Sequence, residues 1–271
     1  MTNNFSKLKL MGVLNVTPDS FSENGKYQNH DDAIAHALRM VDEGADILDI
    51  GGESSRPYAS PVLLEEECQR VIPVIQALSK LTSVPISIDT YKPEVMCRAV
   101  EAGVSIINDI KALREPGALE AARQCNVPVV LMHMKGEPQT MQNHPEYENI
   151  FEEVNLFFKE RIEQCLQAGI KYENLILDPG FGFGKTMAHN FQLLKQLSNF
   201  KKTWKMPLLV GLSRKSLIKK ALGLEVHDSL YPSIALAIYA VLQGVNIIRA
   251  HDVLATRQAL DMIEALEVNV A

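Results

Sequence analysis

The sequence predicts an α/β protein, a single (β/α)8 TIM barrel, and three observations carry this prediction. Short apolar runs alternate with amphipathic segments from residue 8 onward, and eight such pairs follow one another. This alternation is typical of a parallel sheet covered by helices, and eight strands are the number that closes a barrel. The length of 271 residues also suits a fold that typically needs about 250. We expect one domain spanning residues 1–271.

A doubly wound open sheet is the alternative architecture. Such a sheet usually carries a glycine fingerprint directly after its first strand. Here that place holds Asn15-Val16-Thr17-Pro18. The missing fingerprint therefore favours the barrel.

The strands are predicted where short apolar runs end at a polar residue or a proline, as strands buried on both faces do. In chain order these runs are 8–16, 45–50, 84–88, 104–107, 127–132, 175–177, 208–210 and 246–248. Helices are predicted between them from apolar spacing and from start signals, with Asp31 or Asp32 near the first cap and Pro93 at a first helical position. The expected helices are 31–43, 63–81, one from residue 93, 117–125, 146–168, 189–197, 229–242 and 253–266.

Composition excludes several classes of protein. The chain is 46% hydrophobic and 22% charged, with a net charge of -6. No basic patch dominates, so we expect no nucleic-acid partner, and no long uncharged apolar run predicts a membrane span. The N-terminal residues lack the apolar region of a signal peptide, which predicts a cytoplasmic protein. The four cysteines all lie in predicted helices, where reduced packing residues are expected.

The segment NLILDPGFGFGK, residues 174–185, is the most informative stretch. An apolar strand ends at Asp178 and Pro179, and three alternate glycines follow with Phe181 and Phe183 between them. A carboxylate can accept two N–H bonds from the edge of a flat heterocycle, whose face the rings can cover. The alternative is that Asp178 only caps a glycine-shaped turn. The stretch matches neither a Walker A loop nor the GxGxxG fingerprint.

Polar residues stand at the carboxyl ends of nearly all the predicted strands. In a barrel these ends share one rim, where barrel active sites lie. So many polar groups beside apolar strands are hard to explain by packing alone. The rim residues are Asn15, Asp49 with Glu53, Asp89, Asn108, His133, Asp178, Ser213 and Arg249.

Two parts of this rim predict different chemistry. Asp89, Asn108 and Asp178 can together read the edge of a pterin or purine, although strand-end capping is the simpler interpretation. Met132 can pack on the ring, or it is a core residue. At the end of the last strand, Arg249 and His251 point to one face and, with the N-terminus of the next helix, predict an anion site.

Other segments add to this picture. Ser213-Arg214-Lys215-Ser216 follows the seventh strand and adds cations to the anion site, unless it is a solvated basic turn. For His251 a helix-capping role is the alternative. The long loops at 15–28 and 51–61 are of the kind that serve as lids or binding loops.

Eight segments together resemble the dihydropteroate synthase family of folate biosynthesis. They occur in the family's order between residues 12 and 253: GVLNVTPDSFSENG, DIGGESSRP, IDTYKP, INDI, LMHMKG, LDPGFGFGK, GLSRKS and IRAHDV. The resemblance implies a (β/α)8 barrel, usually a homodimer. It implies condensation of 6-hydroxymethyl-7,8-dihydropterin diphosphate with 4-aminobenzoate, which gives 7,8-dihydropteroate and diphosphate, with Mg²⁺ as cofactor.

The resemblance also implies roles for individual residues. The pterin would be held by Asp89, Asn108, Asp178 and Lys215. The diphosphate would be held by Arg249, His251 and Asn15, with Asn15 also a ligand of Mg²⁺. The aminobenzoate would be surrounded by Ser55, Arg56, Pro57, Phe183 and Ser213. Asp19 would close over the reaction centre, so the expected catalytic set is Asp19, Lys215, Arg249 and His251.

Some positions depart from the family pattern. Ser55 stands where a threonine is common, and Tyr58 replaces a small residue, which puts the shape of that loop in question. The first loop reads SENG, with Glu23 in place of a shorter acid, and Ala250 replaces a common valine. Two alternatives stay open: a methyltetrahydrofolate-dependent methyltransferase, which does not need the diphosphate cations, and a non-catalytic pterin-binding protein.

Overall fold

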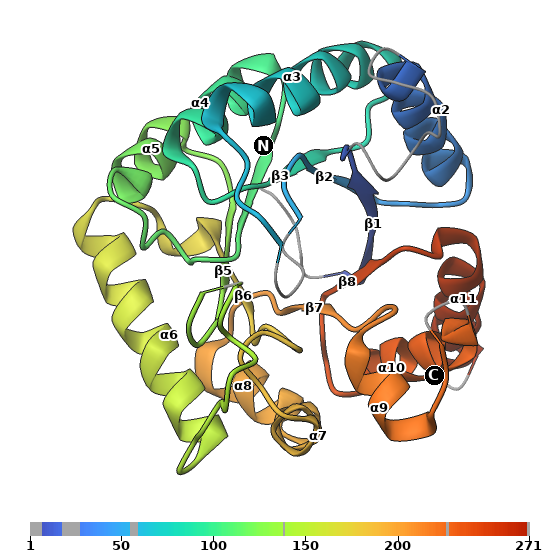
Figure 1. Ribbon diagram of the computed structural model, residues 1–271. Coiled ribbons are helices and arrows are strands. Elements are labelled where there is room, and N and C mark those ends of the chain that lie inside the picture. The colour runs from blue at the N-terminus through green and yellow to red at the C-terminus, as the bar shows by residue number, and fades with distance from the viewer. Residues whose placement is uncertain (1–6, 18–27, 55–58, 138, 226–227, 270–271) are drawn as a thin grey trace.

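The computed structural model describes residues 7–17, 28–54, 59–137, 139–225 and 228–269, and in it eight parallel strands form the wall of a barrel (Figure 1). Each strand lies beside its sequence neighbour, in the order β6-β5-β4-β3-β2-β1-β8-β7. The strands are β1 (Lys9–Asn15), β2 (Ile47–Gly51), β3 (Ile86–Asp89), β4 (Ile106–Asp109), β5 (Val129–Met132), β6 (Leu175–Asp178), β7 (Leu209–Gly211) and β8 (Ile247–Ala250).

The barrel closes between β6 and β7. Leu177 and Leu208 form a parallel bridge there, and the backbone N–H of Leu177 donates to the carbonyl of Pro207 at 3.0 Å. Both edges of the sheet are therefore paired, which leaves no open edge. The (β/α)8 barrel predicted from the sequence is confirmed, and the open-sheet alternative is wrong.

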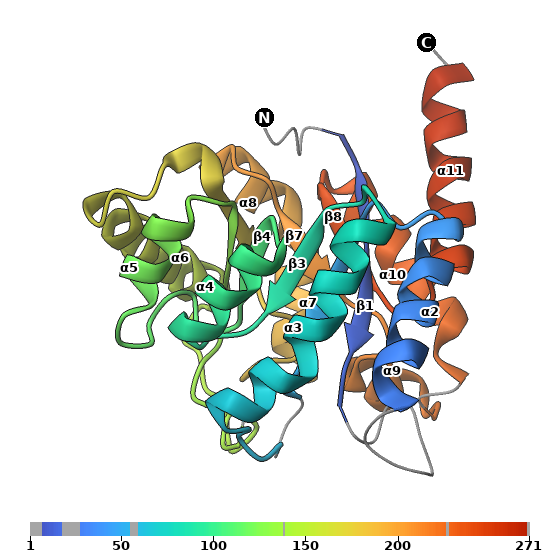
Figure 2. The same cartoon turned by 90° about the horizontal axis from the view of Figure 1, so that it is seen from above.

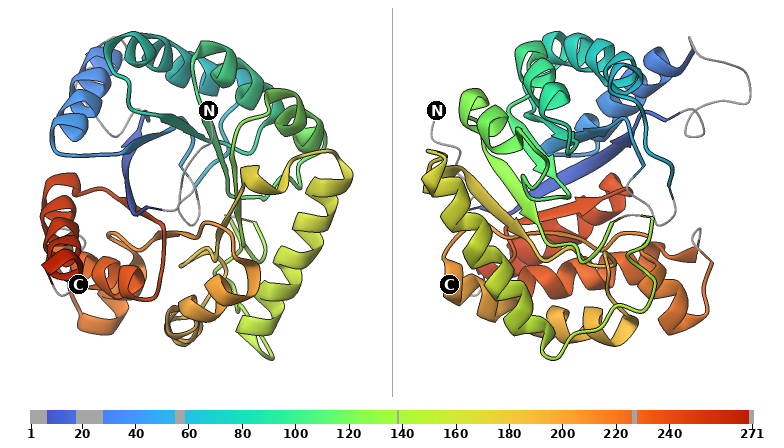
Figure 3. Two further views of the ribbon diagram at one scale, coloured as in Figure 1. Left: turned by 180° about the vertical axis from the view of Figure 1, so that it is seen from behind. Right: turned by 60° about the vertical axis from the view of Figure 1, so that its left-hand side comes forward.

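Helices cover the outside of the strands, as both views of Figure 3 show. They are α2 (Gln28–Asp42), α3 (Leu64–Leu81), α4 (Pro93–Ala102), α5 (Ala118–Cys125), α6 (Ile150–Gln167), α7 (Met187–Lys195), α8 (Leu197–Trp204), α9 (Ser216–Leu222), α10 (Leu230–Leu242) and α11 (Val253–Asn269), with a 3-10 turn η1 (Tyr172–Asn174). In the described part of the chain no helix is long and apolar enough to cross a membrane.

The helices differ from the sequence prediction in several places. Two short helices, α8 and α9, were not predicted. Helix α6 begins at Ile150 rather than at residue 146, because the side chain of Asn149 accepts the backbone N–H groups of Phe151 and Glu152. Helix α7 begins two residues early, because Thr186 and His189 form a reciprocal cap. Helix α2 begins at Gln28, which places Asp31 in its first turn rather than at its cap.

The inside of the barrel contains an apolar lower layer with one side chain from each of seven strands. These side chains form a buried cluster of their own, separate from the core between the strands and the helices: Met11, Ile47, Ile106, Val130, Ile176, Leu209 and Ile247. The remaining strand, β3, contributes Ser87, which is also fully buried. The four cysteines are free, as expected.

An upper layer follows two residues further along each strand. Side chains alternate between the two faces of a strand, so these residues also point into the barrel. The layer consists of Val13, Asp49, Asp89, Asn108, Met132, Asp178, Gly211 and Arg249. In Figure 2 the arrows of β1 and β3 point toward the same end of the barrel, and the upper layer is the one nearer to these carboxyl ends of the strands. The fold thus places the predicted site on an apolar floor.

Candidate active site

Arg249 stands at the centre of the upper layer. Its Nε donates to Oδ2 of Asp49 at 2.6 Å, and its Nη2 donates to Oδ2 of Asp89 at 2.8 Å. Burial acts to lower the pKa of Arg249, but the charges of Asp49 and Asp89 outweigh it and raise this pKa. Arg249 is therefore a fixed cation, and within the described chain its Nη1 is the guanidinium nitrogen that stays available to a ligand.

Asp49 joins Arg249 to Asn108. The amide Nδ2 of Asn108 donates to Oδ2 of Asp49 at 3.0 Å, so this one oxygen serves both neighbours. Asp49 is fully buried, and its Oδ1 has no partner among the described residues. The sequence placed Asp49 on the rim but assigned it no role. The signal was present: a carboxylate inside the apolar run Ile47–Ile50 needs buried partners.

Asp178 faces the site from β6. Its Oδ1 accepts the backbone N–H of Gly180 at 2.7 Å. Burial raises the pKa of Asp178 to about 6, against the opposing effect of that hydrogen bond and of Lys215. Burial likewise raises the pKa of Asp89 to about 7, with Arg249 opposing and Asp49 adding to the shift. Burial therefore makes the ionised form of both carboxylates costly, even with the donors that already reach them from Arg249 and Gly180.

Lys215 lies next to the aromatic wall of the site. Its Nζ lies 4.2 Å from the centroid of the Phe183 ring, within the range of a cation–π contact. Burial and the charge of Arg249 lower the pKa of Lys215 to about 8, and Asp178 opposes this shift. Phe183 packs in a buried cluster with Met132 and Ile110. Met132 is thus both inward-facing and part of an apolar wall.

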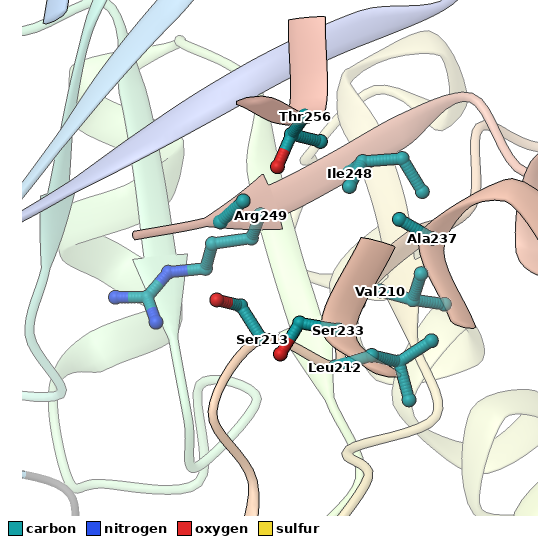
Figure 4. Close-up of a pocket in the computed structure, with 9 residues that line it drawn as sticks. Val210, Leu212, Ser213, Ser233, Ala237, Ile248, Arg249 and Thr256 are labelled. Carbon is teal, nitrogen blue, oxygen red and sulfur yellow. The ribbon is translucent and has the colours of Figure 1, made fainter. Parts of the chain in front are cut away.

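Ser213 and His251 lie together where β7 and β8 end. The Oγ of Ser213 is 3.2 Å from Nδ1 of His251 and accepts the backbone N–H of His251 at 3.3 Å. Burial lowers the pKa of His251 to about 3, with Arg249 adding to the effect, so the free protein holds a neutral imidazole. Figure 4 shows Ser213 beside the Arg249 side chain, at a cavity of about 10 Å³ between β8 and α10.

The structure brings most of the predicted site residues together. Asp89, Asn108, Met132, Asp178 and Arg249 belong to one layer, and Phe183, Lys215, Ser213 and His251 adjoin it. Asn15 ends β1 opposite Gly51, the residue of β2 that also pairs with Asp89. Asp19, Ser55, Arg56 and Pro57 lie outside the described residues.

One rim prediction is corrected, and the basic loop after β7 is divided. His133 does not face the site, because its ring is buried against Phe157 and its Nδ1 is 2.9 Å from Nζ of Lys185. Arg214 is paired, because its Nε donates to Asp252 at 3.0 Å, and its charge still helps to lower the pKa of His251. Position near the end of a strand did not tell which side chains face the site. Lys215 faces it and His133 does not, because the direction of each side chain depends on the fold around it.

The arrangement combines two chemistries. Acceptors at Asp89 and Asp178, an amide at Asn108 and a flat wall at Phe183 suit a heterocycle with N–H groups on its edge. The Arg249 Nη1 and the His251 region suit an anion beside it. In the described part of the chain no three His, Cys, Asp or Glu side chains gather in a way that would hold a metal by themselves.

Comparison with known proteins agrees with this geometry. Residues 11–251 match the family described as pterin binding enzyme. Dihydropteroate synthase of Escherichia coli K12 is 52% identical over 256 residues, covering 94% of this chain and 90% of that protein. The crystal structure of Yersinia pestis dihydropteroate synthase in a sulfonamide drug complex superposes with a TM-score of 0.93 at 47% identity, covering 99% and 97% of the two chains.

A second solved structure comes from Xanthomonas albilineans, a dihydropteroate synthase with 4-aminobenzoic acid. It has a TM-score of 0.92 at 47% identity and covers 97% of this chain and 94% of that one. The barrel and its polar upper layer thus define a pterin-binding enzyme. Within that class the chain belongs to the dihydropteroate synthase family, whose members are transferases of folate biosynthesis. The resemblance seen in the sequence is confirmed, and the methyltransferase and non-catalytic alternatives are not supported.

Proposed function

We propose that the upper layer and its neighbours carry out the condensation of 6-hydroxymethyl-7,8-dihydropterin diphosphate with 4-aminobenzoate through the residues named from the sequence. The observation that carries this assignment is the buried carboxylate of Asp178 on β6, which lies only two strands from Arg249 on β8 and feels its charge. In this arrangement Asp178, Asp89 and Asn108 bind the pterin edge, and Lys215 donates to the same ring. Phe183 and Met132 cover its face.

The diphosphate end of the substrate would lie near Arg249, His251 and Asn15. Arg249 supplies a preorganised positive charge where negative charge develops on the leaving group. His251 is neutral in the free protein, so it would donate a hydrogen bond or gain a proton as the anion arrives. These groups stabilise the departing diphosphate without forming a covalent bond to the protein.

Asn15 is the protein ligand that we assign to Mg²⁺. No described group of three acidic, histidine or cysteine side chains stands at the site. One amide oxygen therefore fits an ion that is held mainly by substrate phosphates and water, as Mg²⁺ commonly is. When bound there, the ion would supply further positive charge to the leaving group. Asn15→Ala should raise the Mg²⁺ concentration needed for half-maximal turnover, while Asn246→Ala at the other end of the barrel should not.

The 4-aminobenzoate would lie against Phe183 and Ser213. The Xanthomonas albilineans relative has been solved with 4-aminobenzoic acid, which supports 4-aminobenzoate as a ligand of this chain. Ser55, Arg56, Pro57 and Asp19 are assigned from the sequence resemblance alone. Asp19 would stabilise the cationic carbon that forms when the C–O bond breaks, while the amine of 4-aminobenzoate attacks it.

A turnover assay with both substrates tests this function. We expect diphosphate and 7,8-dihydropteroate to appear in equal amounts, and only when both substrates and Mg²⁺ are present. If the protein binds the pterin without turnover, it is a non-catalytic pterin-binding protein. Methyl transfer from methyltetrahydrofolate without diphosphate release would make the protein a methyltransferase.

We also propose that the chain forms a homodimer through α10. This helix is apolar on nearly all sides, and such helices are usually buried. Its outward residues Tyr231 and Leu242 are nevertheless 79% and 62% exposed. Sedimentation should show a dimer that Leu242→Glu converts to monomers, whereas Leu81→Glu at the end of α3 should leave it intact. The cytoplasmic location expected from the sequence stays a prediction.

A further inference from the structure

Lys185 is a buried lysine to which the reaction assigns no role. Its side chain is only 2% exposed, and its Nζ is within hydrogen-bond distance of four acceptors. Three are backbone carbonyls, of Gly180 at 2.8 Å, Phe183 at 2.9 Å and His133 at 3.2 Å, and the fourth is Nδ1 of His133 at 2.9 Å. A buried amine is costly unless its hydrogens are bonded, so this set of partners satisfies it fully.

The acceptors belong to two loops that the lysine holds together. Gly180 and Phe183 are the ends of one turn, in which the N–H of Phe183 donates to the carbonyl of Gly180 at 3.1 Å. His133 belongs to the loop after β5. The two loops touch so closely that a Cβ on Gly180 would lie 2.0 Å from the His133 carbonyl oxygen, and Gly180 has φ of +67°. The Lys185 amine is thus the polar centre of a tightly packed junction.

The turn held by Lys185 carries parts of the active site. The N–H of Gly180 donates to Asp178, and the ring of Phe183 forms the wall below Lys215. Asp178 is also held by β6, whereas Phe183 belongs to no strand or helix, although Asn190 of α7 accepts the N–H of the adjacent Gly182 at 2.7 Å. The position of the Phe183 ring therefore depends on the hydrogen bonds of the turn as well as on its packing against Met132 and Ile110.

We propose that Lys185 is a positioning residue of this enzyme, which sets the Phe183 wall by fastening the Gly180–Phe183 turn to the loop after β5. Lys185 itself reaches no ligand. The link to 4-aminobenzoate rests on the proposed function, in which Phe183 contacts that substrate. The turn has a second side-chain anchor in Gln142, whose Nε2 donates to the carbonyl of Gly182 at 2.5 Å.

The chain offers a matched control in Lys201. Its Nζ also fastens backbone, with bonds to the carbonyl of Met206 at 3.2 Å and to Oδ1 of Asn246 at 2.6 Å. These bonds lie at the opposite end of the barrel, before β7 and β8. Lys201→Met therefore removes lysine bonds of the same kind from a partly buried turn without touching the site.

The test compares Lys185→Met with Lys201→Met. We expect both variants to lose thermal stability. Lys185→Met should raise the KM for 4-aminobenzoate about tenfold, a change of about 1.4 kcal/mol, with a smaller effect on the KM for the pterin substrate. Lys201→Met should leave both KM values as in the parent protein. Equal kinetics in the two variants would overturn the proposal. If Lys185→Met does not fold, Gln142→Ala serves as the substitute test. It removes a single hydrogen bond from the same turn and should raise the KM for 4-aminobenzoate about threefold.

A second measurement does not depend on turnover. In protein labelled with fluorophenylalanine, the Phe183 resonance is identified by its loss in Phe183→Leu. This resonance should broaden or shift in Lys185→Met and stay unchanged in Lys201→Met. A sharp, unshifted signal in Lys185→Met would refute the positioning role. If the parent protein shows no turnover, the proposed function fails while the fluorine signal still decides the role of Lys185.

Discussion

The two layers inside the barrel come from the same strands, two residues apart, and their chemistry is opposite. On β6 the lower residue is Ile176 and the upper is Asp178, and on β8 they are Ile247 and Arg249. Burial of the apolar side chains in the lower layer stabilises the fold, because it excludes water. In the upper layer burial acts on charged side chains, and it shifts their pKa values against the charged form. The comparison shows that the lower layer provides stability and that the upper layer gives up stability for ligand binding.

The largest effect is expected from Arg249→Met. This change removes the donor aimed at the leaving group and leaves Asp49 and Asp89 without their cation. Losing one preorganised donor typically lowers turnover by about 10²–10³, and we expect at least that loss in kcat.

Arg257→Met is the control for charge removal, because Arg257 is also a paired arginine. It bonds Asp261 at 2.6 Å and Asp46 at 3.4 Å, away from the upper layer. Turnover should be close to that of the parent protein. A similar kcat in both variants would mean that Arg249 only balances charge.

A slightly smaller effect is expected from Asp178→Asn. Loss of a buried charged partner should weaken pterin diphosphate binding by about 2–4 kcal/mol. The folded pKa of Asp178 is raised to about 6, so its ionised form at pH 7 costs stability, and the neutral asparagine should keep or raise the melting temperature. Calorimetry on the folded variant checks the affinity. Unchanged affinity would separate Asp178 from pterin recognition.

His251 should make the protein sensitive to acid. Its pKa is lowered from 6.5 to about 3 on folding, so between these values the unfolded chain binds more protons and stability falls as the pH drops. The free energy of unfolding falls between pH 7 and pH 5, and this fall should be smaller by about 1–2 kcal/mol in His251→Gln than in the parent protein. Urea unfolding at both pH values measures this, with the exposed His144→Gln as control. An unchanged pH dependence in His251→Gln would contradict the buried neutral imidazole.

The smallest effect is expected from Ile176→Val in the lower layer. Removing one methylene from a packed core costs about 0.5–1.5 kcal/mol of stability. Both KM values should stay unchanged, in contrast to Asp178→Asn two residues further along the same strand. A clear change in pterin KM would show that the lower layer also shapes the site and that the two layers are not independent.

The sequence by itself determined the eight repeated units and the polar ends of their strands. Both are local: apolar runs predict buried strands, and alternation predicts which residues share a face. This was enough to place Asp89, Asn108, Asp178 and Arg249 on one rim. It was not enough for α8 and α9, which are short helices whose ends depend on the packing around them.

Tertiary structure alone decided which polar groups meet. Asp49 and Arg249 are 200 residues apart in the chain and 2.6 Å apart in the barrel. His133 and Lys185 bond each other behind the wall, while Lys215 lies beside Phe183 inside it. The reason is physical: a strand's pattern fixes the direction of a side chain, but a partner is selected by closure of the barrel, which brings distant strands and loops into contact.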